Sequence, residues 1–281
     1  MAEPVTIYEM GPRDGLQNQA RLIPTADKIA LVDMLSETGL RKIEVTSFVS
    51  PKWVPQMADA AEVMAGITRA PGLTCGVLTP NLRGLERALE AGAREVALFA
   101  SASAGFSKAN INATIAESME RLRPVAKAAL AAGATVRGYV SCITDCPFDG
   151  STPPAKIATV TQALLEMGCY EVSLSDTIGQ ATHETLVPAL EAALTVAHPA
   201  QLAGHYHDTG SRALDNIRLS LEYGLRTFDA AAGGLGGCPY APGAAGNVAT
   251  EAVVEMLEAS GFETGIDLPK LRAAATFARS L

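Results

Sequence analysis

The stretch Gln201-Leu202-Ala203-Gly204-His205-Tyr206-His207-Asp208 predicts a β-strand that ends in two histidines. Because side chains alternate between the two faces of a strand, both imidazoles project to the same side. Two converging nitrogen ligands suit a divalent metal ion, from manganese to zinc. The fold around this strand end must therefore supply the remaining ligands.

Seven other short stretches have the composition of strands, and longer helical patterns separate them. Together with the stretch above, the predicted strands are residues 5–10, 42–48, 73–78, 95–100, 135–141, 171–175, 201–207 and 227–232. Helical patterns include residues 25–37 and 154–167, and Gly168 follows the second where a helix C-cap is expected. Repeated βα units of this kind predict a parallel sheet.

Eight βα units form either a closed barrel or an open doubly wound sheet. The first βα turn lacks a nucleotide-binding glycine pattern, and no linker or low-complexity segment divides the 281 residues, so the barrel is favoured. The chemical groups that lie at or just past strand ends, where barrels carry their functional sites, are Arg13, Asp14, Asp176, His205 and His207. We expect a single (β/α)8 TIM barrel over residues 1–281, with an additional C-terminal helix at 268–279.

Composition excludes several classes of protein. The chain has 22 basic and 30 acidic residues, a net charge of −8, and no basic cluster that would follow a phosphate backbone, so nucleic acid is not an expected partner. No apolar run reaches the roughly 18 residues of a membrane span, and the first residues do not resemble a signal peptide. Five widely spaced cysteines argue against a disulfide framework. We expect a cytoplasmic protein that does not interact with membranes.

Asp14 is a candidate third ligand for the ion. It follows the first predicted strand within Gly11-Pro12-Arg13-Asp14-Gly15, a turn-rich segment that can aim one carboxylate inward. In a barrel the first strand lies beside the eighth and near the seventh, which carries both histidines. The alternative is an ordinary Asp-Gly turn with a solvated carboxylate, but the histidine pair favours the ligand.

Residues 233–247 form a glycine-rich loop after the last predicted strand. Such loops are entropically costly and usually functional inside a compact barrel, so we interpret this one as a catalytic lid. Asn247 either caps the helix expected at 248–259 or supplies an amide oxygen to the ion. Cys238, between glycine and proline, is either an acid–base group in polarised surroundings or a surface thiol without a role.

Several motifs together resemble the 3-hydroxy-3-methylglutaryl-CoA lyases, a family of metal-dependent TIM-barrel lyases related to Claisen-type synthases. The resemblance covers nearly the whole chain, and its most specific part is the loop Gly233-Gly234-Leu235-Gly236-Gly237-Cys238-Pro239-Tyr240-Ala241. Its other motifs are residues 9–18, 43–49, 108–112, 138–142 and 175–179. It implies retro-Claisen cleavage of 3-hydroxy-3-methylglutaryl-CoA to acetyl-CoA and acetoacetate, as in leucine degradation or ketone-body formation.

The resemblance also implies a role for each matched residue. Asp14, His205, His207 and Asn247 would bind a divalent cation, magnesium or manganese. The catalytic residues would be Arg13, Asp14, His205 and Cys238. The residues that face the acyl-CoA substrate would be Arg13, Gln17, Glu44, Tyr139 and Asp176. In this scheme the ion lowers the pKa of the 3-hydroxyl, Asp14 or His205 takes its proton, Arg13 faces the enolate oxygen, and Cys238 protonates the enolate carbon.

The sequence departs from the family pattern near the barrel mouth, which puts the acyl group in question. Gly210-Ser211-Arg212 stands where the family usually has Tyr-Gly-Gln, and Ala104-Gly105 where it has Glu-Leu. One alternative is therefore the same cleavage of a different 3-hydroxy-3-substituted acyl-CoA. Others are a condensing synthase and a catalytically idle barrel. A homodimer or higher homo-oligomer is possible, for example through the helix at 213–221.

Overall fold

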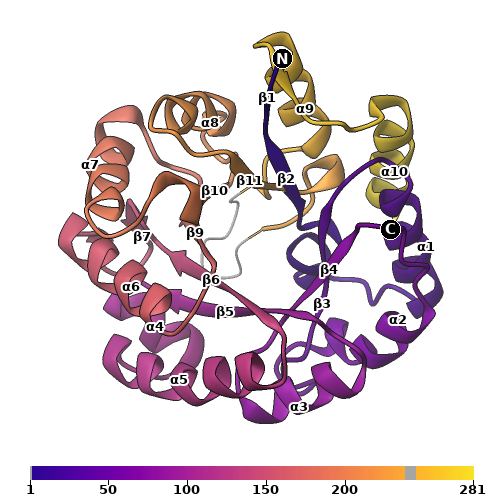
Figure 1. Ribbon diagram of the computed structural model, residues 1–281, viewed down its shortest axis with the longest axis horizontal. Helices are drawn as coiled ribbons and strands as arrows, with labels where there is room; N and C mark the ends of the chain where they lie inside the picture. Colours follow the sequence, from indigo (N-terminus) through magenta and orange to yellow (C-terminus); the bar gives the residue numbers. More distant parts are fainter. Residues whose placement is uncertain (1, 238–244) are drawn as a thin grey trace.

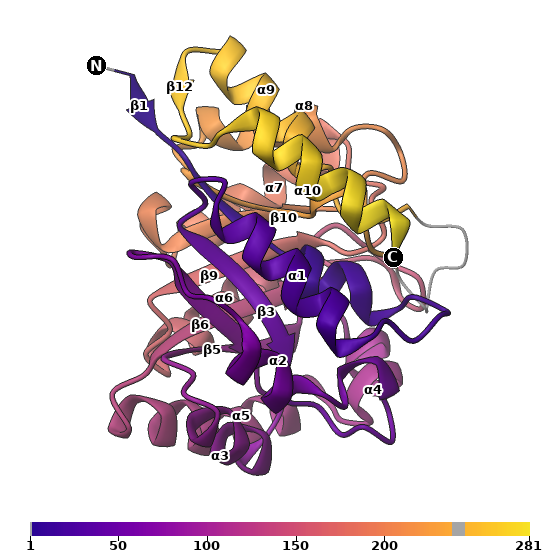
Figure 2. The same cartoon turned by 90° about the vertical axis from the view of Figure 1, so that its right-hand side faces the viewer.

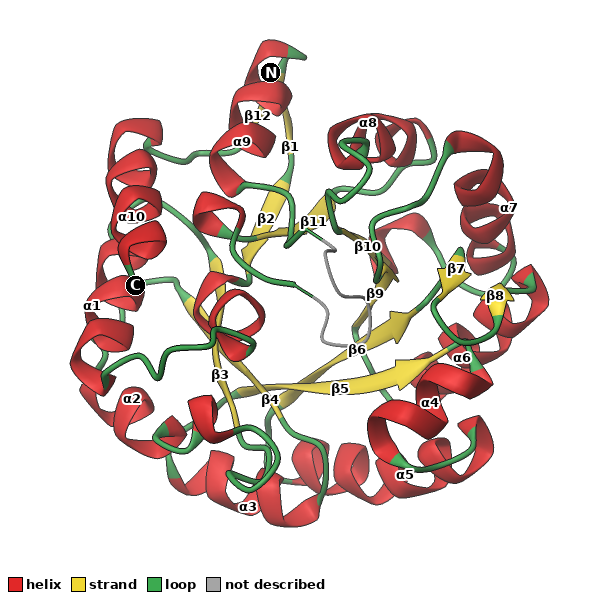
Figure 3. Ribbon diagram, turned by 180° about the vertical axis from the view of Figure 1, so that it is seen from behind, coloured by secondary structure: helices red, strands yellow, loops and turns green. Residues whose placement is uncertain are grey.

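The computed structural model describes residues 2–237 and 245–281. Eight parallel strands close into a barrel in the order β10-β11-β2-β3-β4-β5-β6-β9, and helices surround it (Figures 1 and 3). The strands are β2 (Thr6–Glu9), β3 (Lys42–Ser47), β4 (Thr74–Leu78), β5 (Glu95–Ser101), β6 (Thr135–Ser141), β9 (Glu171–Asp176), β10 (Leu202–Tyr206) and β11 (Thr227–Ala230). Each overlaps one predicted strand, and the predicted (β/α)8 barrel is confirmed.

The helices lie on the outside of the barrel, where α1 to α8 connect its successive strands and α9 and α10 follow the last one. They are α1 (Thr25–Ser36), α2 (Ala60–Gly66), α3 (Leu82–Glu90), α4 (Ala104–Ile111), α5 (Ile115–Ala131), α6 (Pro154–Glu166), α7 (His183–Leu194), α8 (Ala213–Glu222), α9 (Thr250–Ala259) and α10 (Leu268–Ser280). Local signals set their starts: Asn81 and Ser103 accept hydrogen bonds from the first turns of α3 and α4. The additional helix α10 packs beside α1 (Figure 2). Among the described residues, no helix is long and apolar enough to cross a membrane.

Several short elements were not predicted from the sequence. Strand β1 (Glu3–Pro4) pairs in parallel with β12 (Phe262–Glu263), and β7 (Asp145–Cys146) forms a small hairpin with β8 (Gly150–Ser151). Short helical turns are η1 (Gly11–Gly15), η2 (Pro55–Met57), η3 (Pro199–Gln201) and η4 (Ala232–Gly234). The most important is η1, a π-helical turn where the sequence indicated an irregular turn.

Side-chain alternation along the strands produces two different interiors. Outward-facing residues such as Ile43, Val96 and Phe228 belong to the large apolar cluster between strands and helices. Inside the barrel, a small cluster contains Tyr8 and Tyr139. Barrel interiors are usually filled by branched aliphatic side chains. This barrel instead encloses aromatic and charged groups.

The guanidinium of Arg137 lies fully buried at the centre of this polar interior. Its Nη2 donates to Asp229 Oδ1 at 2.8 Å, and its Nε donates to Glu171 Oε1 at 2.8 Å. The guanidinium carbon stacks 4.4 Å from the ring centroid of Tyr8. Buried charges are tolerated only when they are paired in this way. Arg137 therefore holds together carboxylates from two other strands.

We expect Arg137→Met to lower the free energy of unfolding by about 3–5 kcal/mol, because two buried carboxylates lose their partner. Urea unfolding measures this change. The control is Arg218→Met, which breaks an ion pair with Asp215 in which both side chains are more than half exposed. That pair should contribute at most about 1 kcal/mol. Equal losses in the two variants would contradict the role assigned to Arg137.

Candidate metal centre and active site

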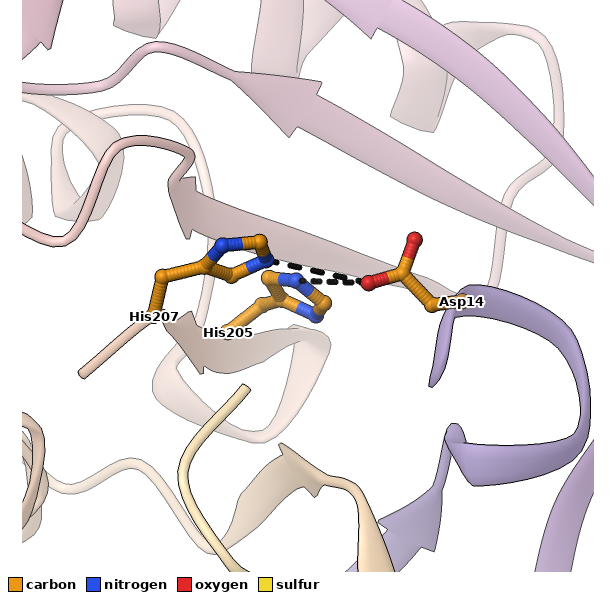
Figure 4. Close-up of side chains that lie close together, drawn as sticks. All are labelled: Asp14, His205 and His207. Carbon is orange, nitrogen blue, oxygen red and sulfur yellow. Dashed lines mark ion pairs between the residues drawn. The ribbon is translucent and has the colours of Figure 1, made fainter. Parts of the chain in front are cut away.

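Asp14, His205 and His207 converge at the carboxyl ends of the strands. The Nε2 atoms of His205 and His207 lie 3.9 Å and 3.7 Å from Asp14 Oδ2. Figure 4 shows the three side chains pointing toward one another, with both imidazoles joined to Asp14 by dashed lines. Both histidines are at least nine-tenths buried. The structure thus brings the three groups to one point.

Strand alternation and barrel closure explain this convergence. Tyr206 faces outward, where its hydroxyl and that of Ser220 on α8 are 2.7 Å apart, so His205 and His207 face inward. Asp14 lies on η1, directly after β2, and β2 is separated from β10 only by β11. Residues almost 200 positions apart in the sequence therefore meet because their strands are near neighbours in the barrel.

Asn247 joins the same cluster from the far end of the glycine-rich loop. Its segment runs beside the end of β10, where His207 and Asn247 form a β-bridge. The Nδ2 atom of Asn247 donates to Asp14 Oδ2 at 2.8 Å, and Oδ1 is buried without a hydrogen-bond partner among the described residues. Helix α9 begins at Thr250 with Ala249 as its N-cap, so of the two alternatives for Asn247 the helix cap is wrong.

The residues present fit a divalent metal ion. Asp14 offers a carboxylate oxygen, the histidines offer two imidazole nitrogens, and Asn247 has an amide oxygen that no other described residue contacts through a hydrogen bond. Burial disfavours the charged form of Asp14, but Arg13 and the two imidazoles outweigh this effect and hold its pKa well below the ordinary value. Asp14 is therefore ionised, as a metal ligand must be.

Arg13 links this centre to the barrel interior. Its Nη1 donates to Asp14 Oδ1 at 2.6 Å, and its Nε and Nη2 each lie 2.6 Å from Glu44 Oε2. These contacts occupy three of the five guanidinium N–H groups. The guanidinium carbon lies 5.7 Å from the ring centroid of Tyr139. Arg13 therefore contacts Glu44 and Tyr139, two other residues predicted to face the substrate, next to Asp14.

The other predicted site residues are placed differently. Gln17 follows η1, and its Oε1 is buried without a hydrogen-bond partner in the part of the chain that the structure describes. Asp176 ends β9, but its carboxylate accepts hydrogen bonds from the backbone N–H groups of Gln180 and Ala181, so it stabilises its own loop. Its substrate-facing role stays a prediction. Cys238 lies outside the described residues, as does the rest of the segment 238–244 of the predicted lid.

Two buried acids that border the site, Asp229 and Glu9, were not predicted from the sequence. Asp229 lies opposite His205 in the register of β10 and β11, and its Oδ2 lies 3.1 Å from His205 Nδ1. Burial raises the pKa of Asp229, but Arg137 and His205 more than offset this effect and lower it to about 2. One pattern in the sequence could have identified this pair. Asp229 and Arg137 are the only charged residues in the predicted strands 227–232 and 135–141, and both occupy inward positions.

Glu9 connects the two loops that carry the site. Fully buried at the end of β2, it accepts hydrogen bonds from the backbone N–H groups of Gly11 and Ala232, both at 2.8 Å, and from the Thr250 hydroxyl at 2.6 Å. Burial raises the pKa of Glu9 to about 7, although these donors favour its ionised form. Glu9 thereby fixes η1, η4 and α9 relative to one another.

A closed barrel with an Asp/His centre at the carboxyl ends of its strands defines the class of metal-dependent TIM-barrel enzymes. The chain belongs to the HMGL-like family, whose sequence model matches residues 4–278. A mitochondrial hydroxymethylglutaryl-CoA lyase of Gallus gallus is 54% identical over 97% of this chain and 92% of its own length.

Solved structures agree with this assignment. The HMG-CoA lyase of Brucella melitensis superposes with a TM-score of 0.98 at 62% identity, over 99% of each chain. An HMG-CoA lyase of Acinetobacter baumannii, solved with coenzyme A and 3-methylmalate, has a TM-score of 0.93 at 38% identity, over 98% of this chain and 92% of its own. The resemblance inferred from sequence motifs is confirmed.

We expect His207→Ala to weaken Mn²⁺ binding by about 100-fold or more, because groups that merely orient a ligand are already worth about 10–100-fold. Isothermal titration of the metal-free protein measures the affinity. His198→Ala is the matched control, since His198 is exposed and lies outside the cluster. Unchanged affinity in His207→Ala would contradict the proposed ligand set.

The raised pKa of Glu9 predicts that the stability of the folded protein depends on pH. Because its pKa is higher in the folded than in the unfolded state, the folded protein binds its proton more tightly, and stability falls as pH rises from about 4.5 to about 7. Glu9→Gln cannot titrate, so wild type should lose up to about 3 kcal/mol relative to this variant between pH 5 and pH 8. Urea unfolding at both pH values measures the difference.

The control for this experiment is Glu120→Gln, which removes a carboxylate from an exposed position on α5. Its stability relative to wild type should not change between the two pH values by more than a few tenths of a kcal/mol. If Glu9→Gln behaves in the same way as this control, Glu9 does not titrate in that range.

Proposed function

We propose that this protein is a carbon–carbon lyase that cleaves 3-hydroxy-3-methylglutaryl-CoA to acetyl-CoA and acetoacetate, with Mg²⁺ or Mn²⁺ as its cofactor. One observation carries the proposal: Asp14 is shared between the guanidinium of Arg13 and the cluster of His205 and His207. A cation site and a fixed positive charge thus adjoin, as cleavage into an enolate and a ketone requires. Membership of the HMGL-like family supports the same reaction.

Asp14, His205, His207 and Asn247 would hold the ion. When bound, it would lower the pKa of the substrate 3-hydroxyl and orient that group. The Oδ1 atom of Asn247 supports its inclusion, because it is a buried amide oxygen without a hydrogen-bond partner in residues 2–237 and 245–281. Oxygens of the substrate would complete the set of ligands.

Removal of the hydroxyl proton requires a base near Asp14. Asp14 is itself a weak base, because Arg13 keeps it ionised. His205 acts on the site through Nε2, since its Nδ1 contacts Asp229. One lone pair cannot bind an ion and accept a proton together. His205 would therefore serve as a ligand or as the base, but not as both at once, and Asp14, His207 and Asn247 would hold the ion while His205 Nε2 accepts the proton.

Arg13 would stabilise the negative charge that develops when the bond between C2 and C3 breaks. Three of its N–H groups contact Asp14 and Glu44, which leaves two for the thioester oxygen of the departing enolate. The carboxylates hold the guanidinium in place before the substrate arrives, so little reorganisation is needed. The enolate carbon is then protonated, and Cys238 of the glycine-rich loop is our candidate for this step.

An acyl-CoA substrate is supported by the A. baumannii relative, which was solved with coenzyme A. The free Oε1 of Gln17, close to η1, is available to a substrate polar group. Participation in leucine degradation or ketone-body formation follows from this reaction as part of the proposal. The cytoplasmic location and any homo-oligomer likewise stay predictions.

Metal-stripped protein should release acetyl-CoA from 3-hydroxy-3-methylglutaryl-CoA only after Mg²⁺ or Mn²⁺ is added, as measured by mass spectrometry. Asp14→Ala should lower kcat at least 100-fold, because it removes both a ligand and the partner of Arg13. His183→Ala, an exposed residue at the start of α7, should keep wild-type activity. If metal-loaded protein released no acetyl-CoA, this would contradict the proposal that 3-hydroxy-3-methylglutaryl-CoA is the substrate.

A further inference from the structure

We propose that Asp229, held by Arg137, is a positioning residue that fixes His205 in the tautomer with a proton on Nδ1 and a lone pair on Nε2. The inference rests on the proposed function only in that His205 belongs to the proposed centre. Asp229 and Arg137 lie deeper in the barrel and touch none of Asp14, His207 and Asn247 through a hydrogen bond or ion pair among the described residues.

The contacts of Asp229 account for both of its carboxylate oxygens. Oδ1 accepts a hydrogen bond from Arg137 Nη2 at 2.8 Å, and Oδ2 accepts one from Ser173 Oγ at 2.8 Å. Arg137 Nη1 also donates to Oδ2, at 3.2 Å. His205 Nδ1 is the remaining contact of Oδ2, at 3.1 Å. The first three contacts come from donors on β6 and β9, so the position of the carboxylate does not depend on His205.

The chemistry of these partners determines where the imidazole proton lies. An ionised carboxylate can only accept hydrogen bonds, and the guanidinium beside it keeps it ionised. The ring nitrogen that faces Asp229 must therefore be the donor, so Nδ1 carries the proton. Neutral imidazole has one N–H, which leaves a lone pair on Nε2, the atom that faces Asp14. This is the form that can bind an ion or accept a proton.

The two histidines of the cluster are not equivalent in this respect. In the described part of the chain, His207 Nδ1 is buried and has no hydrogen-bond partner, so no described carboxylate sets its tautomer. His205 is therefore the member of the pair whose Nε2 is prepared before any ion or substrate binds. Carboxylates that accept from the distal nitrogen of a metal-binding histidine also increase its basicity.

Arg137 orients a second group that borders the site. Its Nη1 donates to the hydroxyl of Tyr139 at 2.8 Å, and the Tyr139 ring meets the His205 ring edge-on with 6.4 Å between centroids. One guanidinium thus positions His205 through Asp229 and supports its ring through Tyr139. Because Arg137 contacts both Asp229 and Tyr139, we infer that it orients His205 in addition to stabilising the barrel.

Long-range ¹H–¹⁵N spectra of metal-free protein labelled with ¹⁵N-histidine test the proposal directly. At pH 9, above the usual imidazole pKa of about 6.5, these spectra distinguish the two neutral tautomers. The chain has four histidines, and His205→Gln identifies the relevant signals. We expect a proton on Nδ1 of His205. A wild-type His205 with its proton on Nε2 would overturn the proposal, and this measurement needs no variant of Asp229.

Asp229→Asn and Glu171→Gln form a matched pair, since each converts one carboxylate partner of Arg137 to an amide and only Asp229 contacts His205. In Asp229→Asn, the amide oxygen should stay on Arg137 Nη2, which cannot accept. The new NH₂ group then faces Ser173 and His205, both of which can accept. The His205 proton should move to Nε2, and Mn²⁺ affinity should fall about 10–100-fold.

Glu171→Gln should keep the proton on Nδ1 and keep Mn²⁺ affinity within about threefold of wild type. A tautomer that is unchanged in Asp229→Asn, or equal losses of affinity in the two variants, would overturn the proposal. The tautomer is read in metal-free protein without substrate. Failure of the proposed lyase activity would therefore leave this test intact, and failure of this test would leave the lyase activity to be judged separately.

Discussion

The ion-pair network around Arg137 is the constraint on which the barrel interior depends. A buried guanidinium must be neutralised, and here the partners come from β9 and β11 while Arg137 itself lies on β6. Replacing a buried network of this kind by apolar side chains of similar volume is often neutral or even stabilising. Stability alone therefore does not explain the network. Its contact with His205 does, because an apolar interior would leave that imidazole without an orienting group.

The site itself depends on the closure of the barrel. Asp14, His207 and Asn247 come from three distant parts of the chain, yet they meet because β10, β11 and β2 are neighbours and because the segment around Asn247 returns to the end of β10. The glycine-rich loop thus begins and ends beside the same strands. Glu9 connects both sides of this arrangement, since it holds η1 and η4 together.

Much of this arrangement was predictable from the sequence, for identifiable reasons. Strand length, alternation and punctuation gave the eight strands, and the His-x-His pattern fixed the direction of both imidazoles. Contacts that depend on register were not predictable. Asp229 meets His205 only through the pairing of β10 with β11. Asn247 does not cap α9, because this helix begins three residues further along the chain. The π-helical turn of η1 arises from tertiary packing that local composition does not encode.

The charged interior also limits how this chain can change over generations. Loss of Arg137 alone leaves two buried carboxylates without their partner, and loss of Asp229 or Glu171 leaves the guanidinium with one carboxylate instead of two, whereas a joint replacement by apolar residues leaves no buried charge. The three positions should therefore be inherited as a unit. Among distant barrels they should be either all present or all absent, and a lineage that lost all three would be expected to have found another way to orient the histidine, or to have abandoned its chemistry.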